Sequence, residues 1–259
     1  MNIFKATNFT VPFSHGMAIA AAIFAPVAYL ASGQLWMLLT SLVIWQVLNI
    51  VGISAGVHRY FSHHAFKCNR FWQWTMAYLS MVSLVGPPCI WAEAHVKHHR
   101  NADKEGDPYL RFMLTGATPM THTTLIGKPF LSRCVRRDRL HLLTLKYYWL
   151  FVLSYPAALI ALGALTHLNV VDCLFWFFLV PAGLSQLTLR FILWTGHLKN
   201  LGYRNYATED TSNNFWLAAL IGGGEGWHNN HHHDLRQANL GKRWWELDPG
   251  YWFIWMIKQ

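Results

Sequence analysis

The stretch LWMLLTSLVIWQVLNIVGISAGV, residues 35–57, is followed at once by HRYFSH, residues 58–63. The first part is free of charge and exceeds the roughly 20 apolar residues that cross a bilayer. The second part contains two histidines, whose imidazoles are common metal ligands. Because a spacing of five does not fit one face of a regular α-helix, we expect the helix to end or unwind between His58 and His63. The sequence therefore predicts a membrane span with two candidate metal ligands at its C-terminal end.

Apolar stretches of similar length recur in the chain, which has 259 residues, of which 53% are hydrophobic and 13% charged. This composition is typical of a membrane protein. Short turns at Gly33 and Asn169 separate the stretches into two pairs, and we expect an all-α integral membrane fold of two helical hairpins. We also expect residues 1–259 to form a single domain. The predicted spans are residues 14–32, 35–57, 147–168 and 171–194.

Positive charge is distributed unevenly along the chain. All 21 lysines and arginines lie outside the two turns, and all but Arg190 lie outside the four spans. The positive-inside rule then predicts that both termini and all histidine motifs are cytoplasmic. The net charge of +9 is better explained by this topology and by anionic lipid headgroups than by nucleic acid.

A fifth apolar stretch, residues 71–92, is not counted as a span. If it crossed the bilayer, it would place the first two histidine motifs on opposite sides, which a shared metal site forbids. The sequence Gly86-Pro87-Pro88 favours a broken path, so we expect an interfacial or re-entrant segment. The polar residues 100–146 are expected to form a cytoplasmic helical cap.

Nine histidines fall into a pattern that indicates a metal centre. His95-Val96-Lys97-His98-His99 and His228-Asn229-Asn230-His231-His232 place imidazoles at i, i+3 and i+4, on one face of a helix. With His58, His63 and a lone His197 there are too many ligands for one four-coordinate ion, which predicts two metals in one cage. Val96 and Asn229 occupy the position where zinc hydrolases carry glutamate. Imidazole-rich sites suit iron, copper or zinc, and oxygen chemistry on apolar substrates favours iron.

These motifs resemble those of the integral-membrane fatty acid desaturases. The resemblance rests on the first motif, on Trp91-Ala92 with the second motif and Asp107-Pro108, and on Gly224-Glu225-Gly226-Trp227 with the third. It extends over about residues 35–252 and is greatest to the Δ9 acyl-CoA and acyl-lipid branch. It implies a di-iron oxygenase that uses O2 and two electrons to insert a cis double bond into a fatty acyl chain. The implied iron ligands are His58, His63, His95, His98, His99, His197, His228, His231 and His232.

The remaining histidines do not match the spacing of the family. His64 and His233 adjoin motifs but fall off that spacing, and we expect neither to be a ligand. The others are expected to be structural or solvated: His15, His122, His141 and His167.

One position departs from the family pattern. The family usually carries an asparagine four residues before the lone histidine, where it contributes to one iron through water; here the residue is Leu193. The second iron is therefore expected to have only four protein ligands, which would leave it more open or more easily lost. A hydroxylase or an acetylenase on the same scaffold stays an alternative.

Three acidic residues near the motifs are candidates for orienting the imidazoles. They are Asp103, Asp107 and Glu225. The alternative is that they are surface acids that balance nearby basic residues.

An alkyl chain must reach the irons without contact with water, so we expect a narrow tunnel lined by tryptophans such as Trp45, Trp74, Trp149 and Trp194. The carrier of the acyl chain can be coenzyme A, acyl carrier protein or membrane lipid. Glu93 stands where animal acyl-CoA desaturases tend to have a basic residue, which disfavours coenzyme A. A basic run suits a phosphate-bearing carrier: Arg133, Arg136, Arg137 and Arg139.

The chain shows no heme-binding module, flavin motif or cysteine cluster, so electrons are expected from a separate ferredoxin, rubredoxin or cytochrome b5-like partner. A metal transporter or metal sensor is the remote alternative. Such a protein would carry ionisable residues along its spans, whereas here only Arg190 lies well inside one. The others lie at span ends: His15, His167 and Asp172.

Overall fold

The computed structural model describes residues 3–110 and 138–259, and within these residues the regular elements are all helices. The predicted all-α class is confirmed. In chain order the elements are α1 (Ile3–Ser32), α2 (Leu35–Val47), η1 (Leu48–Ser62), α3 (Arg70–Val82), α4 (Pro88–Asn101), α7 (Arg139–Lys146), α8 (Tyr148–Thr166), α9 (Val170–Leu174), η3 (Phe175–Leu179), α10 (Val180–His197), α11 (Trp216–Ile221), α12 (His228–His233) and α13 (Pro249–Ile257).

Four continuous helical stretches are long and apolar enough to cross a membrane, as predicted. The first and third, His15–Ser32 and Tyr148–Thr166, have lengths close to a bilayer thickness. The second and fourth, Leu35–Ser62 and Val170–His197, are each 28 residues long. At 1.5 Å per residue such a helix measures roughly 40 Å, about 10 Å more than the hydrocarbon core. The extra turns carry His58 and His197 beyond the predicted ends of these spans.

The second span changes its helix type at Leu48, where α2 continues into the π-helix η1. The N–H of His63 donates to the carbonyl of His58 at 3.3 Å, a hydrogen bond from residue i+5 to residue i. The helix ends at Ser62, between these two residues, as expected, and its last turns are π-helical. One wide turn separates His58 from His63, so both lie on the same face, with ring centroids 5.0 Å apart.

The two hairpins contact each other along α1 and α10. They approach so closely at Gly183 that a Cβ atom there would lie 1.9 Å from the carbonyl oxygen of Ala18. Small residues at a helix crossing permit this backbone approach, which is a common way to pack helices in membranes. The resulting contact fixes α10, and thus His197 at its end, relative to the first hairpin.

Residues 71–92 form a broken path in the structure. Helix α3 ends at Val82, and the chain turns through Leu84 and Gly86, whose φ angles are 63° and 98°. Helix α4 then begins at Pro88, a favourable residue for a first helical turn. With 13 residues, α3 is too short to span a bilayer. It packs along η1, and the break redirects the chain so that α4 carries the second histidine motif back toward the first.

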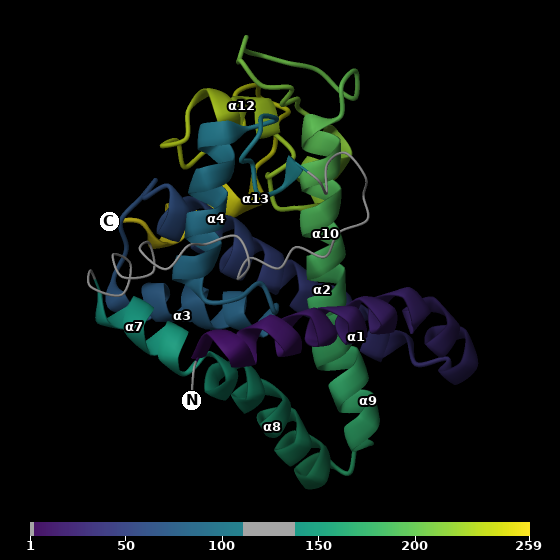
Figure 1. Ribbon diagram of the computed structural model, residues 1–259. Helices are drawn as coiled ribbons and strands as arrows, with labels where there is room; N and C mark the ends of the chain where they lie inside the picture. Colours follow the sequence, from purple (N-terminus) through teal and green to yellow (C-terminus); the bar gives the residue numbers. More distant parts are fainter. Residues whose placement is uncertain (1–2, 111–137) are drawn as a thin grey trace.

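The histidine-bearing elements gather at one end of the molecule. Figure 1 shows α4, α12 and the C-terminal end of α10 on the side opposite the turn between α8 and α9. Helix α13 packs against η1 at the same end. The motifs, which are far apart in sequence, are thereby brought together.

Candidate metal centre

The nine predicted histidines form two compact groups in which the ligand nitrogens lie within 4.8 Å of one another. The five-histidine group contains His58, His63, His95, His99 and His231. The four-histidine group contains His98, His197, His228 and His232. The groups are adjacent, because the rings of His99 and His232 lie 4.4 Å apart. His64 and His233 belong to neither group.

Helices α4 and α12 contribute to the two groups in complementary ways. In α4, His95 and His99 enter the five-histidine group and His98 enters the four-histidine group. In α12, His231 enters the five-histidine group. The outer pair of that helix enters the other group: His228 and His232. Each H-x-x-H-H motif therefore serves both groups, because its residues at i and i+4 point to one side and its residue at i+3 points to the other.

The nitrogens in each group have the spacing of ligands around one metal ion. In the five-histidine group, the Nε2 atom of His231 lies 2.9 Å from that of His58 and 2.9 Å from that of His99. In the four-histidine group, the Nε2 atoms of His197 and His228 lie 3.1 Å apart. For a metal–nitrogen bond of about 2.1 Å, two ligands at right angles lie about 3 Å apart. The residues therefore fit a metal at each position.

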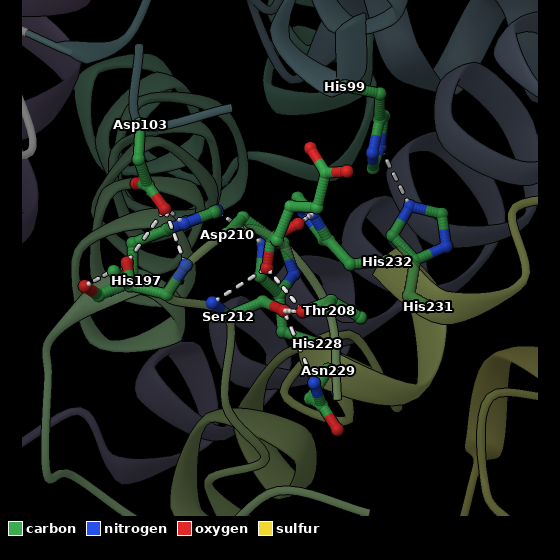
Figure 2. A network of polar contacts seen from close by, with 12 residues as sticks. His99, Asp103, His197, Thr208, Asp210, Ser212, His228, Asn229, His231 and His232 are labelled. Carbon is green, nitrogen blue, oxygen red and sulfur yellow. Dashed lines mark hydrogen bonds and ion pairs between the residues drawn. The ribbon is translucent and has the colours of Figure 1, made fainter. Parts of the chain in front are cut away.

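Carboxylates contact the outer nitrogen of four of these imidazoles. Two pairs lie near α4, where Nδ1 of His98 is 2.9 Å from Asp107 and Nδ1 of His197 is 3.0 Å from Asp103. Figure 2 shows Asp103 beside His197. A carboxylate on Nδ1 leaves the lone pair on Nε2, which is the nitrogen that faces the group.

The other two pairs are His232 with Asp210, at 2.8 Å, and His58 with Glu225. All three acids named in the sequence analysis thus contact a histidine. Asp210 was missed, because it lies in the loop after α10 and 22 residues before His232 in sequence. Its neighbours hold it in place, since Oδ1 of Asp210 accepts hydrogen bonds from the Thr208 hydroxyl and the Ser212 N–H (Figure 2).

A buried arginine, also missed from the sequence, joins the first motif to the third. Arg59 is 1% exposed, and its guanidinium lies 2.9 Å from Glu225 and 2.8 Å from Asp248. It also donates to the carbonyl of Ala238. Glu225 therefore contacts both His58 and Arg59, and this ion-pair cluster ties η1 to the start of α13.

The electrostatics favour protonation states suited to metal binding. Burial, followed by the neighbouring imidazoles, holds the pKa values of His95, His99, His228 and His231 well below their usual value. Burial lowers the pKa of His232 to about 4 even though Asp210 opposes the shift. These imidazoles are neutral near pH 7, as ligands must be.

The pKa values of three carboxylates are also lowered, but in their case neighbouring groups overcome the effect of burial. Burial alone would raise the pKa of Asp103, Asp210 and Glu225, but hydrogen bonds and nearby imidazoles lower each of them instead. Arg59 also lowers the pKa of Glu225, which falls to about 2. All three are ionised near pH 7, so each can polarise the imidazole that it contacts.

The two asparagines of the third motif anchor α12. The side-chain oxygen of Asn214 accepts hydrogen bonds from the N–H groups of Asn229 and Asn230, near the start of the helix. Asn230 in turn donates to Glu246, at 2.9 Å. These contacts satisfy N–H groups that a helix start otherwise leaves unpaired, and they orient the histidines of α12 toward the metal centre.

The other histidines lie apart from the two groups. His64 is exposed, and His233 is exposed and stacks on Tyr206 with centroids 3.9 Å apart. His15 is buried in the first span and contacts the carbonyl of Leu84. His141 lies in α7 with Arg139, and His167 follows α8. The last histidine and the rest of the basic run lie outside the described part of the chain: His122, Arg133, Arg136 and Arg137.

A small apolar cavity of about 50 Å³ adjoins both histidine groups. His58 and His95 reach it from the five-histidine group, and His228 reaches it from the other. Leu193 lies in its wall and is 7% exposed. None of the four tryptophans predicted to line a tunnel borders it; the tryptophan in the wall is Trp91, and the other apolar residues are Ile53, Tyr109, Leu189 and Ile192.

Comparison with known proteins gives consistent similarities. A family model described as Fatty acid desaturase matches residues 33–254. Delta-9 acyl-lipid desaturase 2 of Arabidopsis thaliana is 27% identical over an alignment of 260 positions, and the match covers 96% of this chain and 77% of that protein. The sn-2 palmitoyl-lipid 9-desaturase of Nostoc sp. (strain 36) is 28% identical, and the match covers 80% of this chain and 73% of that protein. A hex-5-enoyl acyl-carrier-protein acetylenase of Moorena producens (strain JHB) is 27% identical, and the match covers 82% of this chain and 71% of that protein.

Proposed function

The chain belongs to the fatty acid desaturase family, and from this premise we propose that it is a membrane di-iron oxygenase that inserts a cis double bond into a fatty acyl chain. Membership makes it an oxidoreductase that acts on fatty acyl chains and a multi-pass membrane protein. Membership therefore argues against a metal transporter or a metal sensor. The proposal concerns the metal, the oxidant and the position of the double bond.

One observation carries the proposal: nine imidazoles form two adjacent groups with ligand spacing, beside an apolar cavity. The overall reaction converts two neighbouring CH2 groups, O2, two electrons and two protons into a cis alkene and two waters. Two iron ions held there would activate O2 to remove the two hydrogens. We assign His58, His63, His95, His99 and His231 to one iron and His98, His197, His228 and His232 to the other.

The protein's own part in this reaction is to hold ligands and to keep water away. Asp103, Asp107 and Glu225 would fix the tautomers of the histidines that they contact. The cavity wall formed by residues such as Ile53 and Leu189 would seat the alkyl chain next to both groups. Away from the histidines and Glu225, the wall offers water few hydrogen-bond partners.

The family resemblance and the two Δ9-type relatives support a Δ9-like position for the double bond. The relatives named for lipid-linked and carrier-protein-linked chains support these two carriers over coenzyme A, as Glu93 does. We propose that a separate ferredoxin, rubredoxin or cytochrome b5-like protein supplies the electrons, and that the metal centre and both termini face the cytoplasm.

Metal analysis and product analysis test the proposal directly. We expect two iron ions per chain in protein purified after iron-replete expression, and a monounsaturated product when a redox partner and O2 are supplied. A value near one metal per chain, or zinc in place of iron, would contradict the di-iron assignment. Feeding lipid-linked and carrier-protein-linked chains in parallel identifies the carrier.

A pair of neighbouring variants tests the ligand assignment. His231→Ala removes a nitrogen that lies 2.9 Å from those of two other histidines, so it should abolish turnover and lower the iron content. His233→Ala, two residues further along the chain, changes an exposed histidine outside both groups and should retain turnover and iron. Full activity in His231→Ala would refute the assignment.

An acetylenase or hydroxylase is the second candidate. Leu193 in the cavity wall and the similarity to an acetylenase favour it, because an open position on the metal of the four-histidine group would tolerate other reaction outcomes. Mass spectrometry of the product separates the three cases: loss of two hydrogens, loss of four, or gain of one oxygen.

A further inference from the structure

The two histidine groups differ in the number of carboxylates behind them. In the four-histidine group, three of the four imidazoles have an aspartate on Nδ1, at 2.8–3.0 Å. In the five-histidine group, His58 is the one imidazole that pairs with a carboxylate of the described residues, that of Glu225. The group with fewer nitrogens thus has more negative charge around it.

The charges also differ in how they are compensated. Glu225 is paired with the buried guanidinium of Arg59, so its negative charge is neutralised next to the five-histidine group. Among the described residues, no lysine or arginine forms an ion pair with the carboxylate of Asp103, Asp107 or Asp210. Arg204 donates instead to the backbone carbonyl of Asp210. The oxygens of these aspartates that do not face imidazoles accept from neutral donors, such as the N–H and hydroxyl of Thr211 on Asp103.

We infer that the two metal positions are unequal, and that the four-histidine group holds its ion more tightly. Loss of one carboxylate behind a metal-binding histidine typically lowers affinity by about 10- to 100-fold. We take three aspartates without an ion-pair partner to contribute more together than the single additional histidine of the other group. The five-histidine group is then the position that empties first. This inference rests on the proposed two-metal function.

Timed chelation of the iron-loaded, full-length protein in detergent tests this order. Iron per chain is measured by mass spectrometry after graded exposure to a chelator such as EDTA. The wild type should lose one iron in a fast step and the second in a slow step. The fast step should be absent in His63→Ala, and the slow step should be absent in His197→Ala.

A charge-removing variant tests the cause. Asp210→Asn keeps an oxygen that can accept from His232 but removes the negative charge, so the slow step should accelerate about 10- to 100-fold. The fast step should keep its wild-type rate, which excludes general misfolding. Asp107→Asn serves as a second variant with the same expectation. Glu209→Gln is the matched control, because this neighbouring side chain is 90% exposed and, within the described part of the chain, pairs with Lys104 on the surface.

The possible failures are distinct. If both irons leave at one rate, if the slow iron is lost in His63→Ala rather than in His197→Ala, or if Asp210→Asn behaves like Glu209→Gln, the inferred inequality is overturned while the di-iron proposal stands. If the purified protein never contains two metals, the proposed function itself fails.

Discussion

At the level of single residues, Arg59 is a buried charge on which both the fold and the metal centre depend. It is buried between Glu225 and Asp248, and Glu225 contacts the ligand candidate His58. A buried charge that loses its partner leaves the remaining charges desolvated without compensation, which costs far more than a surface pair contributes. This arginine therefore connects the stability of the fold to the position of His58.

We predict that Arg59→Met lowers the free energy of unfolding by about 3–5 kcal/mol, because Glu225 and Asp248 are left buried and unpaired. The matched control is Arg70→Met, whose ion pair with Asp138 at 2.8 Å is partly exposed and should contribute only about 0–1 kcal/mol. Denaturant unfolding of both variants in detergent measures the difference. Equal effects of the two substitutions would contradict a structural role for the buried cluster.

At the scale of elements, helix geometry decides where the histidines point. The π-helix η1 places His58 and His63 on one face, whereas in a regular α-helix residues five apart diverge. The length of the second and fourth spans brings their last turns to the level of α4 and α12. The contact of α1 with α10 at Gly183 then sets the position of the second hairpin.

We expect Gly183→Ala to destabilise the protein by about 1–3 kcal/mol, since the added methyl group would force α1 away from α10. Gly16→Ala is the matched control, because a Cβ at that position of α1 has no atom within 4 Å. Thermal unfolding in the same detergent compares the two variants. A Gly183→Ala protein as stable as Gly16→Ala would show that the helices tolerate separation there.

At the scale of the whole molecule, the metal centre joins the ends of two spans to two helices that lie outside the spans. The groups draw on the ends of η1 and α10 and on the short helices α4 and α12. Ions that bind only this arrangement stabilise it by mass action, by about 2.7 kcal/mol when the metal is at 100 times its dissociation constant. Helix α8 contributes no histidine to either group.

Removal of the metals should therefore loosen one end of the molecule. We predict faster hydrogen exchange in α4 and α12 after chelation, with exchange in α8 unchanged, because α8 packs within the hairpins and away from the histidines. Hydrogen–deuterium exchange with mass spectrometry measures both regions in one experiment. A uniform increase over all three helices would indicate that the metals stabilise the entire fold.

The spans, the hairpins and the nine candidate histidines could be predicted from the sequence, because they depend on local properties. Apolar stretches of sufficient length indicate membrane helices, and spacings of three and four residues indicate neighbouring positions on a helix surface. The same reasoning found Asp103, Asp107 and Glu225, which lie within a few residues of a motif. It also predicted the helix end between His58 and His63, but a spacing of five did not indicate that the last turns are π-helical.

The division of the histidines into groups of five and four could not be predicted, because it depends on how the helices pack. The tertiary structure also revealed Asp210 and Arg59 as partners of the site, and it placed Leu193 and Trp91 in the wall of the cavity. These features depend on contacts between segments far apart in sequence, such as Asp210 with His232 and Arg59 with Asp248. Local periodicity carries no information about such pairs, since they form only when the hairpins pack and the loops close over the ends of the helices.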